Sequence, residues 1–227
     1  MPNLENENVV LEEKTVKGPL FDKDGLMEML KNTLIILAIT LVAGGILGCV
    51  YEVTKGPIAI MEQKKKDDAH QKVFANASSF AEVSLDKNRV KELLAVDYQG
   101  IDINEVFEAY SSNKDLLGYV IEVNSHEGFG GDIIFSIGIT LDGVTNGISI
   151  TSISETAGLG MKAPEVLVPQ FANKNVMSFN VTKTGAAMDN EIDAISSATI
   201  TSNAVVKGVN AALFYYKNEL AGGKSNE

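Results

Sequence analysis

The sequence predicts an α+β protein, with a single N-terminal transmembrane helix followed by one domain that has a mixed, partly antiparallel sheet and flanking helices. Three observations support this class. The run from Asn32 to Tyr51 carries no charge, and its length of about 20 residues suits a hydrocarbon core of about 30 Å. Apolar and polar residues alternate from Phe135 to Leu141, which is typical of a strand. Apolar residues then recur at helical spacing from Val205 to Leu220.

The uncharged run, residues 32–51, is interpreted as a membrane anchor that the mature protein keeps. It follows residues 1–31, a polar and acidic tail that we expect to be partly disordered. A removable signal peptide has a much shorter charged segment before its apolar part. Residues 46–49 resemble a lipoprotein cleavage box, although Leu47 is large where such boxes prefer a small residue. Lipidation of Cys49 is therefore the alternative interpretation.

Lysines flank the predicted span in similar numbers on both sides, so the positive-inside rule does not decide its orientation. Residues 52–80 are expected to form a connecting helix, whose clearest part runs from Met61 to about Phe80 with Ala69, Val73 and Phe74 turned inward. Residues 81–227 are long enough for one globular domain with its own core. The sequence therefore predicts a tail, a span, a connector and one domain.

Composition excludes several functions. The chain has 227 residues and a net charge of −11, whereas nucleic-acid binding needs a basic face. Its one cysteine allows no disulfide within the chain. No set of Cys and His residues suits a metal, and His70 and His126 are expected to be exposed to solvent.

The middle of the domain predicts an antiparallel hairpin. Strands are expected at Leu117–Val123, at Phe135–Leu141 and at Ile148–Ile153, with a turn over residues 142–147 that is rich in Gly, Asn and Asp. The last of these strands leads directly into Glu155–Gly160. We therefore expect that loop to lie at one end of the sheet.

A hydroxyl-rich run, Asp193–Thr199, precedes the C-terminal helix. The helix is expected to begin at Ser202 or Asn203, either of which can cap it. Unpaired N–H groups and the positive end of the helix dipole would then point at the hydroxyls, an arrangement that suits a phosphate. The alternative is an ordinary helix cap without a ligand.

The order Asp-x-x-Ser-Ser-Ala-Thr in this run resembles the flavinylation motif of the FMN-binding domain family, which includes the G subunit of Rnf electron-transport complexes and the C subunit of sodium-translocating NADH:quinone reductases. In that family a flavin transferase esterifies the FMN phosphate to the last threonine of the motif, here Thr199. The family usually has Gly at the position of Ser197. Two further patches occur in family order, Gly128–Gly131 and Glu155–Gly160, with Ala157 in place of the usual Pro.

The resemblance implies a covalently bound FMN held between these segments. Glu155 and Thr156 would hydrogen-bond the ring or the ribityl chain, Leu159 would pack on the ring, and Lys162 would stabilise the reduced, anionic flavin. Asp193 is expected to serve recognition by the transferase. The remaining expected FMN-binding residues are Ser196, Ser197, Ala198, Thr201, Gly158, Gly160, Gly130 and Gly131.

The resemblance also implies a function. The chain would carry electrons as a subunit of an Rnf-type ferredoxin:NAD oxidoreductase that translocates sodium ions or protons, with no substrate of its own. Its partners would be the other membrane subunits and the flavin transferase, and its C-terminal domain would lie outside the cytoplasm at the cell membrane. Two alternatives remain: a free-standing extracytoplasmic flavoprotein, and a membrane-tethered binding domain without flavin.

Overall fold

The computed structural model describes residues 23–221, which divide into two units at the boundary between Ile58 and Ala59. The expected tail over residues 1–31 lies mostly outside the described residues. Its last part, from Lys23, already belongs to helix α1 (Lys23–Val73). The first unit therefore consists, as far as it is described, of the N-terminal part of this helix.

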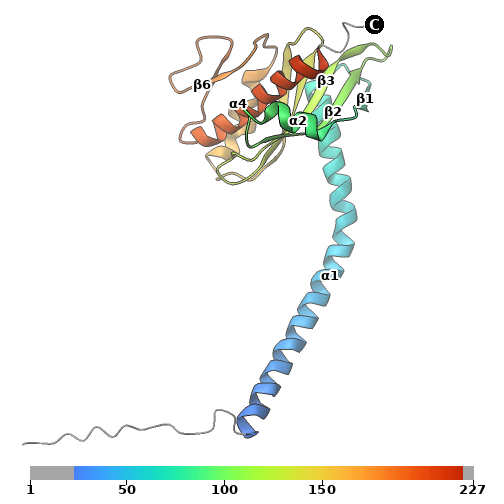
Figure 1. Cartoon of the computed structure of the whole chain (residues 1–227), viewed down its shortest axis with the longest axis vertical. Coiled ribbons are helices and arrows are strands. Elements are labelled where there is room, and N and C mark those ends of the chain that lie inside the picture. Colours follow the sequence, from blue (N-terminus) through green and yellow to red (C-terminus); the bar gives the residue numbers. More distant parts are fainter. Residues whose placement is uncertain (1–22, 222–227) are drawn as a thin grey trace, which may run out of the picture. The chain divides into compact units, whose positions relative to one another are not determined.

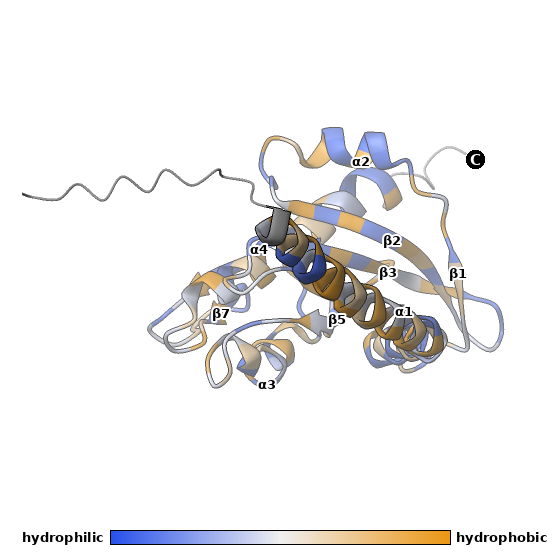
Figure 2. Ribbon diagram, turned by 90° about the horizontal axis from the view of Figure 1, so that it is seen from below, coloured by the Kyte–Doolittle hydropathy of each residue, from blue (hydrophilic) through white to orange (hydrophobic). Residues whose placement is uncertain are grey.

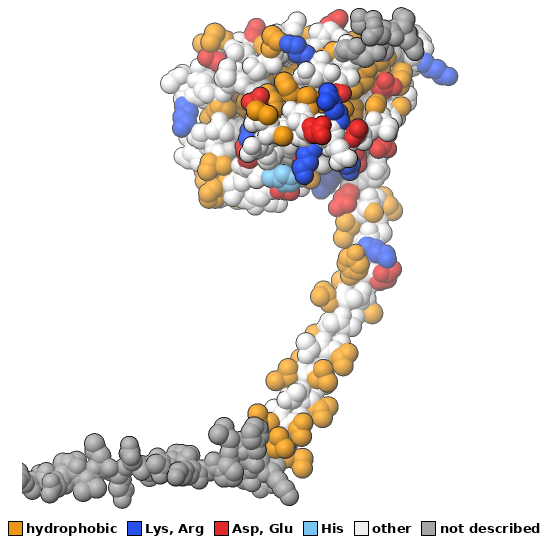
Figure 3. Space-filling view, viewed as in Figure 1, with side chains coloured by type: hydrophobic (Ala, Val, Ile, Leu, Met, Phe, Trp, Pro, Cys, Tyr) orange, Lys and Arg blue, Asp and Glu red, His pale blue; other side chains and the backbone are white. Residues whose placement is uncertain are grey.

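Among the described residues, α1 is the helix that is long and apolar enough to cross a membrane, and its most apolar window has a mean hydropathy of 2.5. Its apolar side chains are uncovered, with Leu34 65% and Leu41 68% exposed. Hydrophobic side chains line this part of the helix in Figure 3, and its ribbon is largely orange in Figure 2. Such an uncovered apolar surface needs lipid or protein around it. These features agree with the predicted membrane anchor.

The second unit is built on a five-stranded antiparallel sheet in which neighbours in sequence are neighbours in space, within the described residues. This confirms the α+β class and the predicted hairpin. Parallel pairing occurs in a separate two-stranded sheet, β6 with β7. The strands of the main sheet are β1 (Ser79–Glu82), β2 (Ile101–Tyr110), β3 (Leu116–Ser125), β4 (Ile133–Thr140) and β5 (Thr145–Ile153).

The main core lies between this sheet and α4 (Thr199–Tyr215), the helix that crosses one face of the sheet in Figure 1. Phe135, Ile137 and Ile139 of β4 are fully buried there, as the alternating pattern predicted. Gly208 of α4 lies so close to the sheet that a Cβ would come within 2.8 Å of the Phe135 ring. The contact fixes the height of α4 above the strands.

The other elements lie at the ends of the sheet and beside β2. Helix α2 (Lys87–Leu94) joins β1 to β2, and Asp86 caps its first turn. The segment after β5 contains three short helical turns and the small sheet, and a π-helical turn ends the described chain. Their bounds are η1 (Gly160–Lys162), α3 (Ala163–Val166), η2 (Val168–Phe171), β6 (Asn180–Thr182), β7 (Glu191–Asp193) and η3 (Tyr216–Leu220).

The end of α1 corrects the expected connecting helix. The helix stops at Val73, and Phe80 belongs to β1 instead. The Gln71 side-chain amide donates hydrogen bonds to the carbonyls of Phe74, Ala75 and Ala77. These bonds hold the turn that follows the helix against its last residues.

The last turns of α1 cover the second face of the sheet. Ala69, Val73 and Phe74 are buried, as the sequence predicted. His70 is buried as well, only 3% exposed, against the expectation that it faces solvent. Its ring packs on Phe107 with a centroid distance of 4.5 Å, and burial lowers its pKa. His126, by contrast, has a 41% exposed side chain, in agreement with the prediction.

Candidate FMN site

A cavity of about 320 Å³ lies where the loop after β5 meets the start of α4. It lies between two of the segments that the resemblance implied would hold FMN. Most of the residues expected to bind FMN form its wall, together with two that were not expected. The lining residues are Phe129, Glu155, Thr156, Leu159, Gly160, Ser197, Ala198, Thr199, Ile200 and Thr201.

The start of α4 differs from the sequence expectation. The helix begins at Thr199, and Ala198 stands at its N-cap without a side-chain cap. Ser202 does not cap the helix, because its buried hydroxyl accepts from the Ile195 N–H at 2.9 Å and donates to the Ala198 carbonyl at 3.0 Å. The first turn of α4 thus has no capping side chain of its own, and an anion at this end would bind its N–H groups.

The hydroxyls of this segment have different roles, as Ser202 and Thr199 show. Ser202 is 0% exposed and holds the turn together. Thr199 is half-buried, stands at the first helical position and lines the cavity. Its hydroxyl therefore belongs to the end of α4 that favours negative charge.

Glu155 joins the two loops that close the cavity. One carboxylate oxygen accepts from the Phe129 N–H at 2.7 Å, which ties the Gly128–Gly131 turn to the segment after β5. The Glu155 side chain also packs against Gly160, where an added Cβ would come within 2.7 Å of it. A side chain at position 160 would therefore displace Glu155 and narrow the cavity.

Apolar side chains form the outer part of the site. Phe129 is 69% exposed, Ile200 54% and Leu159 37%. The lining is thus divided between exposed apolar side chains and a polar set of hydroxyls with one carboxylate. A flat aromatic ring attached to a polar chain and a phosphate matches that division. The residues present thus fit FMN.

Some expected site residues lie outside this wall. Lys162 ends η1 with an exposed side chain, and Ser196 is exposed too. Gly130 packs on the backbone of Ser154, where a Cβ would come within 2.1 Å of the carbonyl oxygen. Gly131 and Gly158 have φ values of 132° and 78°. These glycines shape the loops and are not part of the cavity lining.

Asp193 also lies away from the cavity, at the end of β7. Its backbone N–H donates to the Gln170 side-chain oxygen at 2.7 Å, and its carbonyl accepts from the Gln170 amide at 3.2 Å. Gln170 on η2 therefore holds the start of the motif in place. Sequence reasoning missed this residue, because no local pattern connects positions that lie so far apart in the chain.

Phe129 and Ile200 were missed as cavity residues as well. Phe129 lies inside a glycine-rich turn, and only the glycines of that turn were expected to bind FMN. Ile200 lies inside the hydroxyl-rich run, between Thr199 and Thr201. The sequence pattern that could have indicated Phe129 as a cavity residue is an aromatic residue between two glycines.

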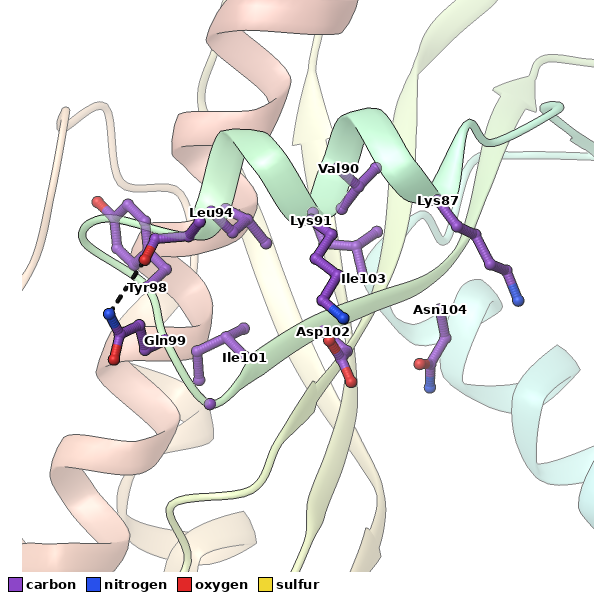
Figure 4. Close-up of a pocket in the computed structure, with 12 residues that line it drawn as sticks. Lys87, Val90, Lys91, Leu94, Tyr98, Gln99, Ile101, Asp102, Ile103 and Asn104 are labelled. Atoms are coloured by element: carbon purple, nitrogen blue, oxygen red, sulfur yellow. Dashed lines mark hydrogen bonds between the residues drawn. The ribbon is translucent and has the colours of Figure 1, made fainter.

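A second cavity, of about 490 Å³, lies between α2 and β2 (Figure 4). Its lining contains none of the residues expected to bind FMN. Lysines on α2 and apolar side chains from both elements surround it. It is a separate feature of the domain.

Comparison with known proteins identifies the domain that contains this cavity. Residues 128–214 match the family model of the FMN-binding domain. The chain is 34% identical over 193 residues to the G subunit of the Na(+)-translocating ferredoxin:NAD(+) oxidoreductase complex of Acetobacterium woodii, covering 83% of this chain and 91% of that protein. It belongs to the family of G subunits of ion-translocating oxidoreductase complexes.

Other G subunits are similar over the same extent. That of the ion-translocating oxidoreductase complex of Methanosarcina acetivorans is 29% identical, covering 83% of this chain and 94% of that protein. That of the proton-translocating ferredoxin:NAD(+) oxidoreductase complex of Clostridium ljungdahlii is 31% identical, covering 85% and 92%. A crystal structure of Shewanella oneidensis NqrC has a TM-score of 0.46 and 14% identity, covering 65% of this chain and 84% of that chain.

The cavity lies within the domain that the family model matches. The matched domain model includes both the Gly128–Gly131 turn and Thr199. The chain thus carries an FMN-binding domain behind an apolar N-terminal helix. As a member of this family it is a membrane-anchored flavoprotein of an oxidoreductase complex.

Proposed function

We propose that this chain carries electrons through FMN esterified to Thr199, within a complex that couples electron transfer to ion translocation. The main support is that the three motif segments, far apart in sequence, line one cavity at the start of α4. Two of the related G subunits are named as parts of ferredoxin:NAD(+) oxidoreductase complexes that translocate sodium ions or protons. Other membrane subunits would be the electron donor and acceptor.

Within the site, each wall has a role that follows from its chemistry. The phosphate would sit at the start of α4, where N–H groups and the helix dipole favour an anion. Phe129, Leu159 and Ile200 would contact the faces and edge of the ring, and Glu155 would keep the Phe129 loop in position. Bound FMN supplies the redox chemistry. Lys162 would need to turn from solvent toward the ring to act on its charge.

Covalent attachment has a physical benefit on the outer side of a membrane, where released FMN would be lost from the cell. A phosphoester on Thr199 retains the flavin and leaves the ring free to exchange electrons. We propose that a flavin transferase forms this bond, with Asp193 as part of its recognition segment, and that the domain lies on the extracytoplasmic side.

Intact mass of the native chain tests the attachment. Protein from a host that has the transferase should be heavier by one FMN less one water, and Thr199→Val should lose both this mass and the yellow colour. Thr201→Val is the matched control, because Thr201 lines the same cavity one position beyond Ile200. An unmodified native chain, or an unchanged mass in Thr199→Val, would exclude Thr199 as the attachment point.

Assembly is tested separately by purification from native membranes. Recovery of the chain with several other membrane subunits supports a role within a complex. Recovery of the chain alone, with its flavin, would instead identify a free-standing electron carrier.

A further inference from the structure

The cavity between α2 and β2 lies along a strand edge that is only partly paired. β1 covers β2 from Phe107 to Tyr110, and the Val83 N–H extends that pairing to the Val106 carbonyl. Toward its start, β2 pairs only with β3, within the described residues. The segment Ile101–Asn104 is therefore an open edge, and it lies next to the cavity.

The backbone groups on this edge can be assigned from the antiparallel ladder. The His126 N–H donates to the Gly100 carbonyl, and backbone groups in such a ladder alternate between the two sides of a strand. Those of Ile101 and Ile103 thus point away from β3, which agrees with the Ile101 N–H donating to Tyr98. Apart from that bond, no turn or loop backbone bond between described residues uses these outward groups.

The cavity beside this edge is apolar at its base and basic at its rim. Val90 and Leu94 of α2 are 5% and 3% exposed and form the base together with both isoleucines. In Figure 4, α2 runs alongside β2, and Lys87 and Lys91 project from it on the side of the strand. None of the salt bridges between described residues involves Lys87 or Lys91.

The one carboxylate of the lining is already engaged. Asp102 accepts a hydrogen bond from the His126 ring at 2.9 Å, and this contact raises the pKa of His126. The same ring also lies 2.9 Å from Asp132, so it is shared between two carboxylates. The lining of this cavity therefore has two lysines against one carboxylate, which is a net positive charge.

We propose that this groove, lined by Lys87, Lys91, Val90, Leu94, Ile101 and Ile103, binds an extended acidic segment of another subunit by strand addition. The segment would pair with the outward carbonyl of Ile101 and with the outward N–H and carbonyl of Ile103. One of its side chains would enter the apolar base, and its carboxylates would contact the lysines. The identity of the partner as a subunit of the complex depends on the proposed function.

Size also favours a short strand as the occupant. The open edge of four residues spans about 13 Å at about 3.3 Å per residue, and the cavity of about 490 Å³ extends along it. Unpaired strand edges attract other strands, so proteins usually cover or protect them. The C-terminal residues 222–227 of this chain have no large apolar side chain to fill the base. A segment from another chain fits better.

Photo-crosslinking in the assembled complex tests the contact. A benzoylphenylalanine at Lys91 should crosslink to a carboxylate-containing segment of another subunit, and the same probe at the exposed Lys183 should not. Hydrogen exchange should show the Ile103 amide at least about tenfold slower in the complex than in the isolated full chain. A crosslink to this chain itself, or unchanged exchange at Ile103, would overturn the proposal.

Charge reversal tests the role of the lysines. Lys87→Glu/Lys91→Glu should reduce the fraction of the chain that co-purifies with the other subunits by roughly tenfold, because repulsion replaces attraction. Lys114→Glu/Lys183→Glu, with the same charge change at exposed positions, should retain it. Equal retention of the two variants by the other subunits would contradict the proposal. Flavin content, measured in each sample, shows whether the proposed function itself has failed.

Discussion

Ser197 lies in the left-handed region of backbone conformation, with φ 62°. This conformation costs a non-glycine residue about 1–2 kcal/mol. The cost gives a physical reason for the Gly that the related motif usually has at this position. The strained turn precedes the first residue of α4 and directs the chain into the cavity wall.

Replacing Ser197 by Gly should therefore stabilise the domain. We expect a gain of about 0.5–1 kcal/mol, since relief of the strain exceeds the entropy cost of glycine, and a rise in Tm of about 1–4 °C. Thermal unfolding of the full chain in detergent, followed by circular dichroism, measures it. Ser196→Gly is the matched control, because Ser196 is exposed and does not have positive φ. Equal Tm changes in the two variants would contradict the argument.

His126 connects two parts of the domain. Its ring nitrogens lie 2.9 Å from Asp102 on β2 and 2.9 Å from Asp132 at the end of the glycine-rich turn. These two hydrogen bonds, the one to Asp102 first, raise its pKa. In the protonated ring both nitrogens donate. Protonation therefore favours the position of the turn that carries Phe129.

The stability of the domain should respond to pH through this residue. Because its pKa is raised on folding, the protonated ring contributes its full stabilisation below about pH 6.5. That contribution is lost as the pH rises through the folded-state value. Urea unfolding of wild type and of His126→Gln across pH 5–9 measures this contribution. The difference between their free energies of unfolding at each pH separates the effect of His126 from the titration of Asp132 and of His70. A difference that stays constant over this range would exclude the linkage.

At the scale of elements, α1 and the sheet meet through a charged contact. Lys66 donates to both carboxylate oxygens of Glu105 at 2.9 Å and lies 3.4 Å from Glu122, which is 3% exposed. Burial acts to lower the pKa of Lys66, but the two carboxylates outweigh it and raise the pKa. Asn104 donates to the other oxygen of Glu122 at 3.2 Å.

Removal of the Lys66 charge should destabilise the second unit strongly. Lys66→Met leaves Glu122 buried without a cation, at a cost of about 3–5 kcal/mol, whereas Lys65→Met, at an exposed neighbouring position, should change little. Adding Glu122→Gln to Lys66→Met should recover much of the loss, because the buried charge is then absent. Denaturant unfolding of the full chain measures all three. Equal effects of the two lysine variants would refute a specific role for Lys66.

How far each element could be predicted depends on whether its signal is local. β4 and β5 follow from alternation, and α4 from helical spacing. β2 escaped prediction because a bulge between Ile103 and Glu105 shifts its register and interrupts the alternation. The burial of His70 depends on β1 and β2, which supply the rings that surround it. No pattern around position 70 could indicate that contact.

On the scale of the whole molecule, hydropathy and motif order together predicted the anchor, the domain and the location of the cavity. The anchor is a local property of composition. The cavity could be predicted because three segments keep their order in the family. The sequence did not predict the hydrogen bonds that hold the loops of the site in place. In these bonds the side chains of Gln170, Glu155 and Ser202 accept from the backbone N–H groups of Asp193, Phe129 and Ile195, respectively. These pairs join loops that only the fold brings together.

The side of the membrane on which the domain lies is the remaining prediction at this scale. The lysine balance around the span does not decide it, so the expectation of an extracytoplasmic domain rests on the resemblance to the FMN-binding domain family. With Cys49→Ser, which removes the one native thiol, a cysteine placed at the exposed Lys183 should react with a membrane-impermeant maleimide in intact cells. A cysteine placed at Asn6, before the span, should react only after lysis. The reverse pattern would place the flavin on the cytoplasmic side, where retention against loss from the cell would no longer explain a covalent bond.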